Sequence, residues 1–434
     1  MLRAPTTIVI TAALLVPAVP AAAATFTVRD VQGLFNGRVS YGALYRLNDR
    51  DEDLIAISSD GNSPSANADD GNLNYDEGLV SSTVRLTGEL ALSRGDLGLF
   101  VRGSAFYDFK NQSDDLARTE FDDDAEKLVG SDVEIRESYV NWRVRPMGVP
   151  SLIRVGQQII NWSETTFVRD GLDLINPVDL VSVLQPASTR DDLRIPQRMA
   201  WFAANITQTF SLETYYQFEW EPVELPPVGW YFSNNDAIGG EGLQSWMFGD
   251  GLVSDLGTDL DDYFSLPEDT LGFDEDFQRL PGRNRDKASD TGQFGVALIG
   301  ILPDSNATKV GLHYVRYHSR FPLIMGRTGD AAAVAATAEP LVAARASALE
   351  TIYLAEGLDS EQAAEMGRSA AEELTLSRYA NEASFFASYP EDIDLFGFSF
   401  STALRQTGTL FAGEISHHLD YPFQIAFNPL LETV

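Results

Sequence analysis

The sequence predicts an all-β protein, an antiparallel transmembrane β-barrel with a helical hairpin inserted between two strands. Three observations predict this fold: an export leader, repeated strands in which apolar and polar side chains alternate, and the absence of cysteine. Successive side chains on a strand point to opposite faces, so alternation produces one apolar and one polar face. In a soluble sheet the apolar face is the core, whereas in a membrane barrel it faces lipid and the polar face lines the lumen.

The N-terminus has the pattern of a signal peptide. Arg3 provides a positive start, residues 8–16 form an apolar run, and residues 21–24 offer a small-residue cleavage site. The run is too short to cross the roughly 30 Å of membrane hydrocarbon. We therefore assign residues 1–24 to the signal peptide and residues 25–434 to the exported barrel. Because an exported chain without cysteine has no disulfides, closure of a barrel would supply stability in their place.

Residues 210–220, FSLETYYQFEW, carry the alternation clearly. If this stretch spans a membrane, a charged side chain on its lipid face costs up to about 2–4 kcal/mol. The apolar side chains that we expect to face lipid are Phe210, Leu212, Phe218 and Trp220. The polar side chains that we expect to line the lumen are Glu213, Gln217 and Glu219.

Similar alternation predicts about eleven strands, many of them near the ten residues that a tilted membrane strand needs. Residues 82–107 form a predicted hairpin around a turn at residues 94–96. Tight links alternate with long polar ones, as periplasmic turns and outer loops do in outer-membrane barrels. Aromatic side chains near the predicted strand ends resemble an interfacial girdle: Tyr41, Tyr45, Tyr107, Phe109, Trp142, Trp162, Tyr215, Tyr216, Trp220, Trp230 and Tyr231.

Two segments do not resemble strands. Residues 330–379 are rich in alanine and have helical periodicity broken at Gly357, which predicts a helical hairpin over or inside the barrel mouth. A mobile outer loop is the alternative. Residues 250–276 contain ten carboxylates and neither lysine nor arginine, which predicts a solvated loop. The same run is also suited to binding divalent cations and bridging lipopolysaccharide phosphates.

Composition excludes several functions. The net charge of −33 comes without any basic stripe, so the chain is not expected to bind nucleic acid. The four histidines lie outside metal-binding motifs, and neither a nucleophile elbow nor a phosphate-binding loop is present. We therefore predict no enzymatic activity and no cofactor, leaving open a structural calcium or magnesium ion at the acidic loops.

The densest group of polar and aromatic residues lies in residues 156–180. Here a predicted strand leads into Trp162, Glu164 and Arg169, which suggests that the chain folds into the lumen and forms a constriction with paired charges. The alternative is a loop held together by its own salt bridges.

A weak cation motif precedes it in DDGNLNYDEG, where oxygen-bearing side chains alternate at Asp70, Asn72, Asn74 and Asp76. A helix–loop–helix calcium loop would need glycine in place of Tyr75 and glutamate in place of Ser81, so we reject that loop. A different weak calcium site and a plain polar turn remain as alternatives.

Four stretches resemble a known family: DDGNLNYDEGLVSS, VGQQIINWSETTFVRDGLDLINPVDL, RIPQ and YPEDIDLFGFSFST. The chain resembles the family catalogued as domain of unknown function 1302, large exported proteins of Gram-negative bacteria. The resemblance implies an outer-membrane barrel. It also implies work with periplasmic and inner-membrane transport proteins on hydrophobic or lipid-like compounds.

The C-terminus departs from this pattern. Family members are usually longer, and outer-membrane barrels usually end in an aromatic residue, whereas this chain ends in Thr433 and Val434. A count of about eleven strands also conflicts with the even number expected of a bacterial barrel. We therefore expect a barrel whose C-terminal strands are missing.

These observations lead to a functional hypothesis: a porin-like outer-membrane channel or export component for hydrophobic small molecules. Its expected partners are outer-membrane lipid, lipopolysaccharide, a periplasmic carrier and an inner-membrane transporter. The alternatives are a structural or adhesin-like outer-membrane barrel and a secreted soluble β protein.

Overall fold

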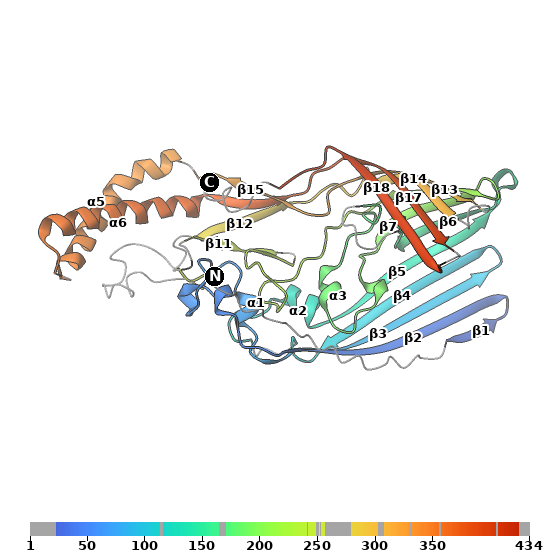
Figure 1. Cartoon of the computed structure of the whole chain (residues 1–434), viewed down its shortest axis with the longest axis horizontal. Coiled ribbons are helices and arrows are strands. Elements are labelled where there is room, and N and C mark those ends of the chain that lie inside the picture. Colours follow the sequence, from blue (N-terminus) through green and yellow to red (C-terminus); the bar gives the residue numbers. More distant parts are fainter. Residues whose placement is uncertain are drawn as a thin grey trace.

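The largest sheet of the structure, a computed structural model, is antiparallel and has twelve strands (Figure 1). The structure describes residues 23–112, 116–164, 171–240, 242–248, 251, 253–256, 279–302, 308–329, 331–355, 357–404 and 407–424. The strands of this main sheet, in spatial order, are β1 (Ala24–Val28), β2 (Val31–Arg46), β3 (Gly78–Arg94), β4 (Leu97–Asp108), β5 (Ser131–Val144), β6 (Ser151–Gln158), β7 (Gln197–Asn205), β8 (Phe210–Gln217), β13 (Phe294–Leu302), β14 (Thr308–Tyr317), β17 (Ile393–Leu404) and β18 (Thr409–Leu419).

Short and long connections alternate along this sheet, as the sequence predicted. The turn between β3 and β4 is two residues long, and Gly95 there adopts a φ of 59° that disfavours other residues. Because each strand is antiparallel to its neighbours, the short turns gather at one end of the sheet and the long connections at the other. The long connections carry the short helices α1 (Asp70–Leu73), α2 (Asp123–Val129) and α3 (Leu180–Leu184).

The number of strands in the main sheet differs from the prediction by one. The missed strand is β1, which pairs with β2 from Ala24↔Phe35 to Val28↔Val31. At five residues it is too short for alternation to reveal it, and it begins at the end of the predicted leader, most of which lies outside the described residues. Within the part of the chain that the structure describes, β1 and β18 are the two ends of the sheet order and are not paired to each other.

A second, four-stranded sheet lies at the end with the long connections. Its order is β11 (Ser245–Met247), β12 (Arg279–Asp286), β16 (Ser384–Ser388) and β15 (Leu323–Arg327), and β12 pairs with β16 in parallel. Its core includes Trp220, Leu280, Phe385 and Tyr389. Alternation did not reveal these strands, because β11, β15 and β16 have five residues or fewer and β12, RLPGRNRD, does not alternate.

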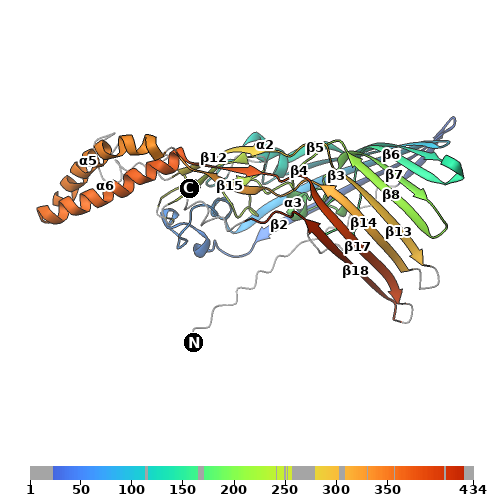
Figure 2. The same ribbon diagram turned by 90° about the horizontal axis from the view of Figure 1, so that it is seen from above.

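The predicted helical hairpin is present between β15 and β16. It consists of α5 (Ala331–Ala355) and α6 (Ser360–Glu382), which meet at the buried side chains of Leu349 and Ala371. Asp359 accepts hydrogen bonds from two backbone N–H groups at the start of α6. The predicted position was wrong: Figures 1 and 2 show the hairpin projecting away from the main sheet, beyond the small one. Among the described helices, none is both long and apolar enough to cross a membrane.

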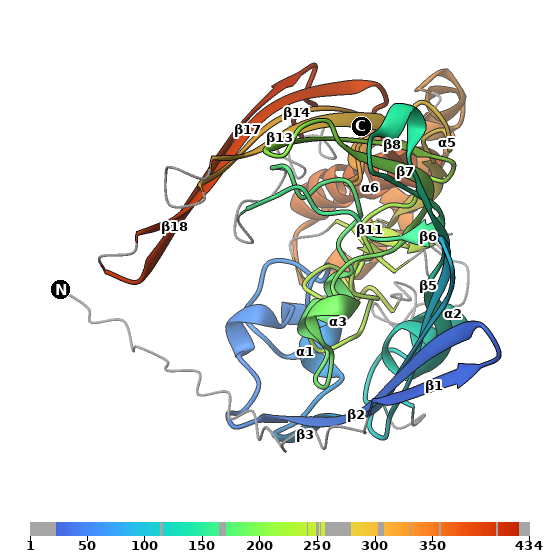
Figure 3. The ribbon, with the colours of Figure 1, turned by 90° about the vertical axis from the view of Figure 1, so that its right-hand side faces the viewer.

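The main sheet has two chemically different faces. Figure 3 shows it curving around α1 and α3, and we call the face toward these helices the inner face. On the other face, apolar side chains lie directly opposite one another across five strands: Leu212, Leu298, Leu312, Phe398 and Ile415. The last four of these are 39% to 71% exposed.

Four aromatic side chains of the predicted girdle are buried instead: Trp162, Tyr215, Trp220 and Trp230. The expected outward position of Trp220 was therefore wrong. β8 ends at Gln217, and Trp220 packs edge-on against Tyr389 with 4.7 Å between ring centroids. Alternation does not continue past the end of a strand. The side chain of Trp220 therefore packs in the core of the small sheet and does not lie on the outer face of the main sheet.

Candidate functional site: the inner face of the main sheet

Buried arginines stand on the inner face of three neighbouring strands. Arg85 in β3, Arg102 in β4 and Arg136 in β5 have only 2%, 4% and 4% of their surface exposed. An arginine stays protonated when buried, so it must find acceptors for its N–H groups. Most of these acceptors come from one segment of the connection between β6 and β7, and the others are Ser104, Glu134 and Glu137 on the strands themselves.

That segment, residues 171–196, is here called the inner segment. Arg136 donates to the carbonyls of Asp192 at 2.7 Å and Arg194 at 2.8 Å, and lies 3.3 Å from the Asp179 carboxylate. Asp179 also caps α3 by accepting a hydrogen bond from the Ser182 N–H at 2.7 Å. The inner segment is therefore fastened to the sheet through both its backbone and its side chains.

The other two arginines hold the middle of the same segment. Arg85 donates to Gln185 Oε1 at 2.6 Å. Arg102 donates to the Asp191 carbonyl at 2.9 Å and lies 3.3 Å from the Glu137 carboxylate. None of the three arginines was predicted as a site residue, although each is an isolated arginine at an inward position of an alternating strand.

Trp162 lies buried in a cluster with side chains of β8 and β14. The Trp162 side chain is 4% exposed, its indole N–H donates to Glu213 Oε2 at 2.9 Å, and its ring packs against Tyr215 and His313. Glu164 lies 2.5 Å from the Lys309 ammonium. Two of the predicted inward residues, Trp162 and Glu213, thus contact each other, while Arg169 lies outside the described residues.

Residues of the C-terminal strands complete this part of the site and were not predicted. Glu414 in β18 accepts hydrogen bonds from Ser163 Oγ at 2.7 Å and from the Leu172 N–H at 3.2 Å. His313 in β14 lies 3.0 Å from Ser399 Oγ in β17. Alternation predicts that Glu414 and His313 point inward. It does not predict their partners, because these lie more than 80 residues away in sequence.

Gln217 is buried in a hydrogen-bond network rather than facing an open space. Its side chain donates to the Ile175 carbonyl at 2.8 Å and accepts from Arg320 at 2.9 Å. Arg320 also donates to the carbonyls of Glu221 and Ile175. Burial lowers the pKa of Arg320 to about 10, which is still high enough to keep it charged at neutral pH.

Glu219 lies just past the end of β8, beside a charged cavity of about 290 Å³. Its carboxylate is 3.6 Å from the Arg198 guanidinium, and both residues line this cavity. Other charged residues that line it are Glu221, Glu224, Arg285 and Lys287. Glu213, Gln217 and Glu219, which were all predicted to line the lumen, therefore lie in three different environments.

The four residues of the weak cation motif do not converge on one point. Asn72 accepts a hydrogen bond from Arg46, Asn74 accepts from the N–H groups of residues 118 and 119, and Asp76 pairs with Arg50 at 2.8 Å. Only Asp70 lies beside other carboxylates, those of Asp69, Asp236 and Asp255. The predicted motif therefore contributes one residue to a cluster that no local pattern indicates.

A family model described as protein of unknown function (DUF1302) matches residues 4–433, essentially the whole chain. No curated protein and no solved structure matches it.

Proposed function

The chain belongs to the DUF1302 family, and we propose that it is an outer-membrane transport component for hydrophobic or lipid-like small molecules. In this proposal the main sheet spans the membrane as part of a β-barrel. The inner segment narrows the passage, and periplasmic and inner-membrane proteins deliver or receive the solute.

The distribution of side chains on the main sheet supports a membrane location. The outer face carries the exposed apolar row that includes Leu312 and Ile415, whereas the inner face buries three arginines. A soluble sheet would bury its apolar face and expose its charges, the reverse of this arrangement. Exposed aromatics near both strand ends, such as Tyr107 and Trp142, suit the two membrane interfaces.

The arrangement at Trp162 supports passage of amphiphilic solutes. Aromatic surface from Trp162, Tyr215 and His313 lies beside the carboxylates of Glu213 and Glu164 and the ammonium of Lys309. Apolar walls with a few placed polar groups are typical of small-molecule sites. The class of solute rests on the family resemblance together with this mixed wall.

A second candidate function is a structural outer-membrane barrel. The observation that favours it is the fastening of the inner segment by Arg85, Arg102 and Arg136, which fills the inner side of the sheet with protein. A transporter would have to loosen this segment during its cycle, whereas a structural barrel would keep it in place.

The first experiment is fractionation of the full-length gene product from a Gram-negative host, followed by a gel of boiled and unboiled outer membrane. Membrane barrels resist detergent and change mobility on boiling, so we expect a detergent-extracted band that shifts. A soluble periplasmic protein without a shift would contradict the membrane proposal. Conductance of the purified protein in planar bilayers then separates transport from a purely structural role.

A further inference from the structure

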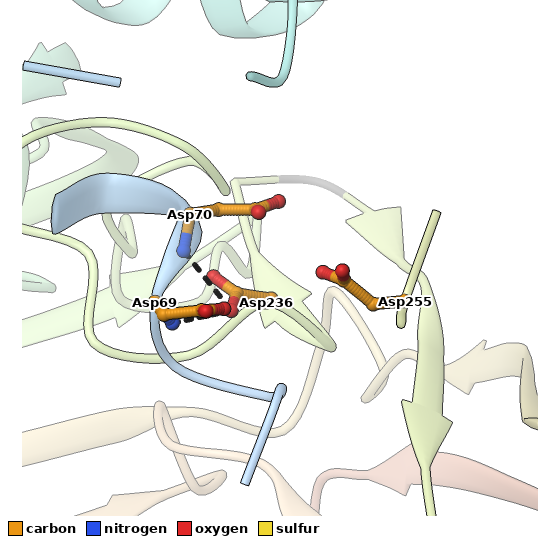
Figure 4. Close-up of side chains that lie close together, drawn as sticks. All are labelled: Asp69, Asp70, Asp236 and Asp255. Atoms are coloured by element: carbon orange, nitrogen blue, oxygen red, sulfur yellow. Dashed lines mark hydrogen bonds between the residues drawn. The ribbon is translucent and has the colours of Figure 1, made fainter. Parts of the chain in front are cut away.

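Four aspartates from two long connections converge at the end of the molecule that carries these connections. Asp69 and Asp70 come from the connection between β2 and β3, and Asp236 and Asp255 from the connection between β8 and β13. One oxygen from each carboxyl group lies within 4.8 Å of those of the others. Figure 4 shows the four side chains facing a common space.

Two oxygens in this cluster are buried without a hydrogen-bond partner among the described residues. They are Oδ1 of Asp69, a residue that is fully buried, and Oδ1 of Asp236, which is 5% exposed. The opposite oxygens are satisfied, by the N–H of Ala56 at 3.0 Å and the N–H of Asp69 at 2.8 Å respectively. A buried acceptor oxygen without a donor destabilises the folded protein, so these two oxygens indicate that a cation binds beside them.

The positive charge of Arg118 does not balance the four carboxylates. Arg118 pairs with both Asp70 and Asp255 but donates no hydrogen bond to Asp69 or Asp236. Four ionised carboxylates this close together repel one another, and one arginine offsets only part of that repulsion. An added cation would relieve this repulsion.

We infer that Asp69, Asp70, Asp236 and Asp255 bind a divalent cation, and that the site prefers calcium to magnesium. All the ligands are oxygens, which hard cations require. Four protein carboxylates suit Ca²⁺ better than Mg²⁺, because Mg²⁺ gives up its water reluctantly and is usually bound through one or two carboxylates and several waters. An adjoining cavity of about 300 Å³, also lined by Asn67 and Thr119, has room for water ligands.

Binding would cross-link connections that are distant in sequence. Asp70 and Asp236 are separated by 166 residues, and Asp255 lies within the acidic run at residues 250–276. The site goes beyond the proposed transport function and does not depend on it, because its residues lie outside the main sheet.

The test is titration calorimetry of the full-length, EDTA-treated protein in detergent with CaCl₂ and, separately, MgCl₂. We expect one Ca²⁺ per chain, weaker Mg²⁺ binding, and a Tm that Ca²⁺ raises by several degrees. Asp236→Asn keeps the side-chain volume and should weaken Ca²⁺ binding at least about tenfold, because it removes one anionic ligand. The matched control is Asp76→Asn, since Asp76 is exposed and pairs with Arg50.

Absence of Ca²⁺ binding by the wild-type protein would overturn the inference, as would equal affinity in Asp236→Asn and Asp76→Asn. If Asp236→Asn does not fold, Asp255→Asn replaces it, because Asp255 lies at the more exposed edge of the cluster. Tighter binding of Mg²⁺ than of Ca²⁺ would overturn the stated preference.

Discussion

Single buried side chains decide how the inner segment is held. Arg136 is the clearest case, because its guanidinium reaches two backbone carbonyls and one carboxylate of that segment. Alternation places this arginine on the inner face, but only the path of residues 171–196 provides its acceptors. The same holds for Trp162, whose indole N–H meets Glu213 across 51 residues of sequence.

Arg136→Met is expected to lower the free energy of unfolding by about 3–5 kcal/mol, since it leaves a buried carboxylate and two carbonyls without their donor. Urea unfolding of the detergent-solubilised protein, followed by tryptophan fluorescence, measures the change. Arg143→Met is the matched control, because Arg143 is an exposed arginine of the same strand. Equal unfolding midpoints for the two variants would mean that Arg136 does not fasten the segment.

Trp162→Phe keeps an aromatic ring but removes the donor to Glu213, so a loss of about 1–3 kcal/mol of unfolding free energy is expected. Trp142→Phe removes an exposed indole and should change stability little. The two variants are compared by the same urea series, monitored by circular dichroism since both lose a tryptophan. A larger loss in Trp142→Phe would contradict the buried hydrogen bond.

Among the elements, the helical hairpin depends least on contacts with the rest of the molecule. β15 and β16 are paired in register, with Arg327 opposite Ser384, so the chain enters and leaves the hairpin at neighbouring points. Its two helices also pack chiefly on each other, around Leu349 and Ala371. Local periodicity is enough to predict such a unit, because its main contacts lie within one stretch of sequence.

Replacing residues 331–382 with a short glycine–serine turn is expected to leave the main sheet intact. A gel of boiled and unboiled protein should show the same mobility shift as for the full chain. Loss of the shift would mean that the hairpin is needed to assemble the main sheet.

At the scale of the whole molecule, the proposed function depends on whether the outer face of the main sheet contacts lipid or water. Leu312 is 59% exposed in the middle of an apolar row that crosses five strands. In water, replacing an exposed leucine would change stability little. In lipid, a charge at this position would be strongly unfavourable.

Leu312→Arg is therefore expected to cost about 2–4 kcal/mol and to reduce the heat-modifiable protein recovered from the outer membrane. Met147→Arg is the control, because Met147 is fully exposed in the turn between β5 and β6. Quantitative blotting of membrane fractions measures the yields. If both variants accumulate equally, the outer face does not lie in lipid.

The sequence by itself determined the elements that depend on local patterns. Alternation located eleven of the twelve strands of the main sheet, and helical periodicity located the hairpin and its break at Gly357. These patterns arise from the two-residue repeat of a strand and the 3.6-residue repeat of a helix, which neighbouring residues alone specify. The strands β1, β11, β15 and β16 have five residues or fewer, too few for a repeat to appear. The sequence of β12, RLPGRNRD, is long enough but has no alternation of apolar and polar residues.

Only the tertiary structure decided which side chains meet. The arginines that hold the inner segment, the burial of Trp220 and the cluster of four aspartates all depend on the paths of long connections between strands. Asp69 and Asp236 come together across 167 residues, and no local spacing relates them. Repeats specify which face a residue occupies, whereas contacts across the molecule follow from the joint packing of distant segments.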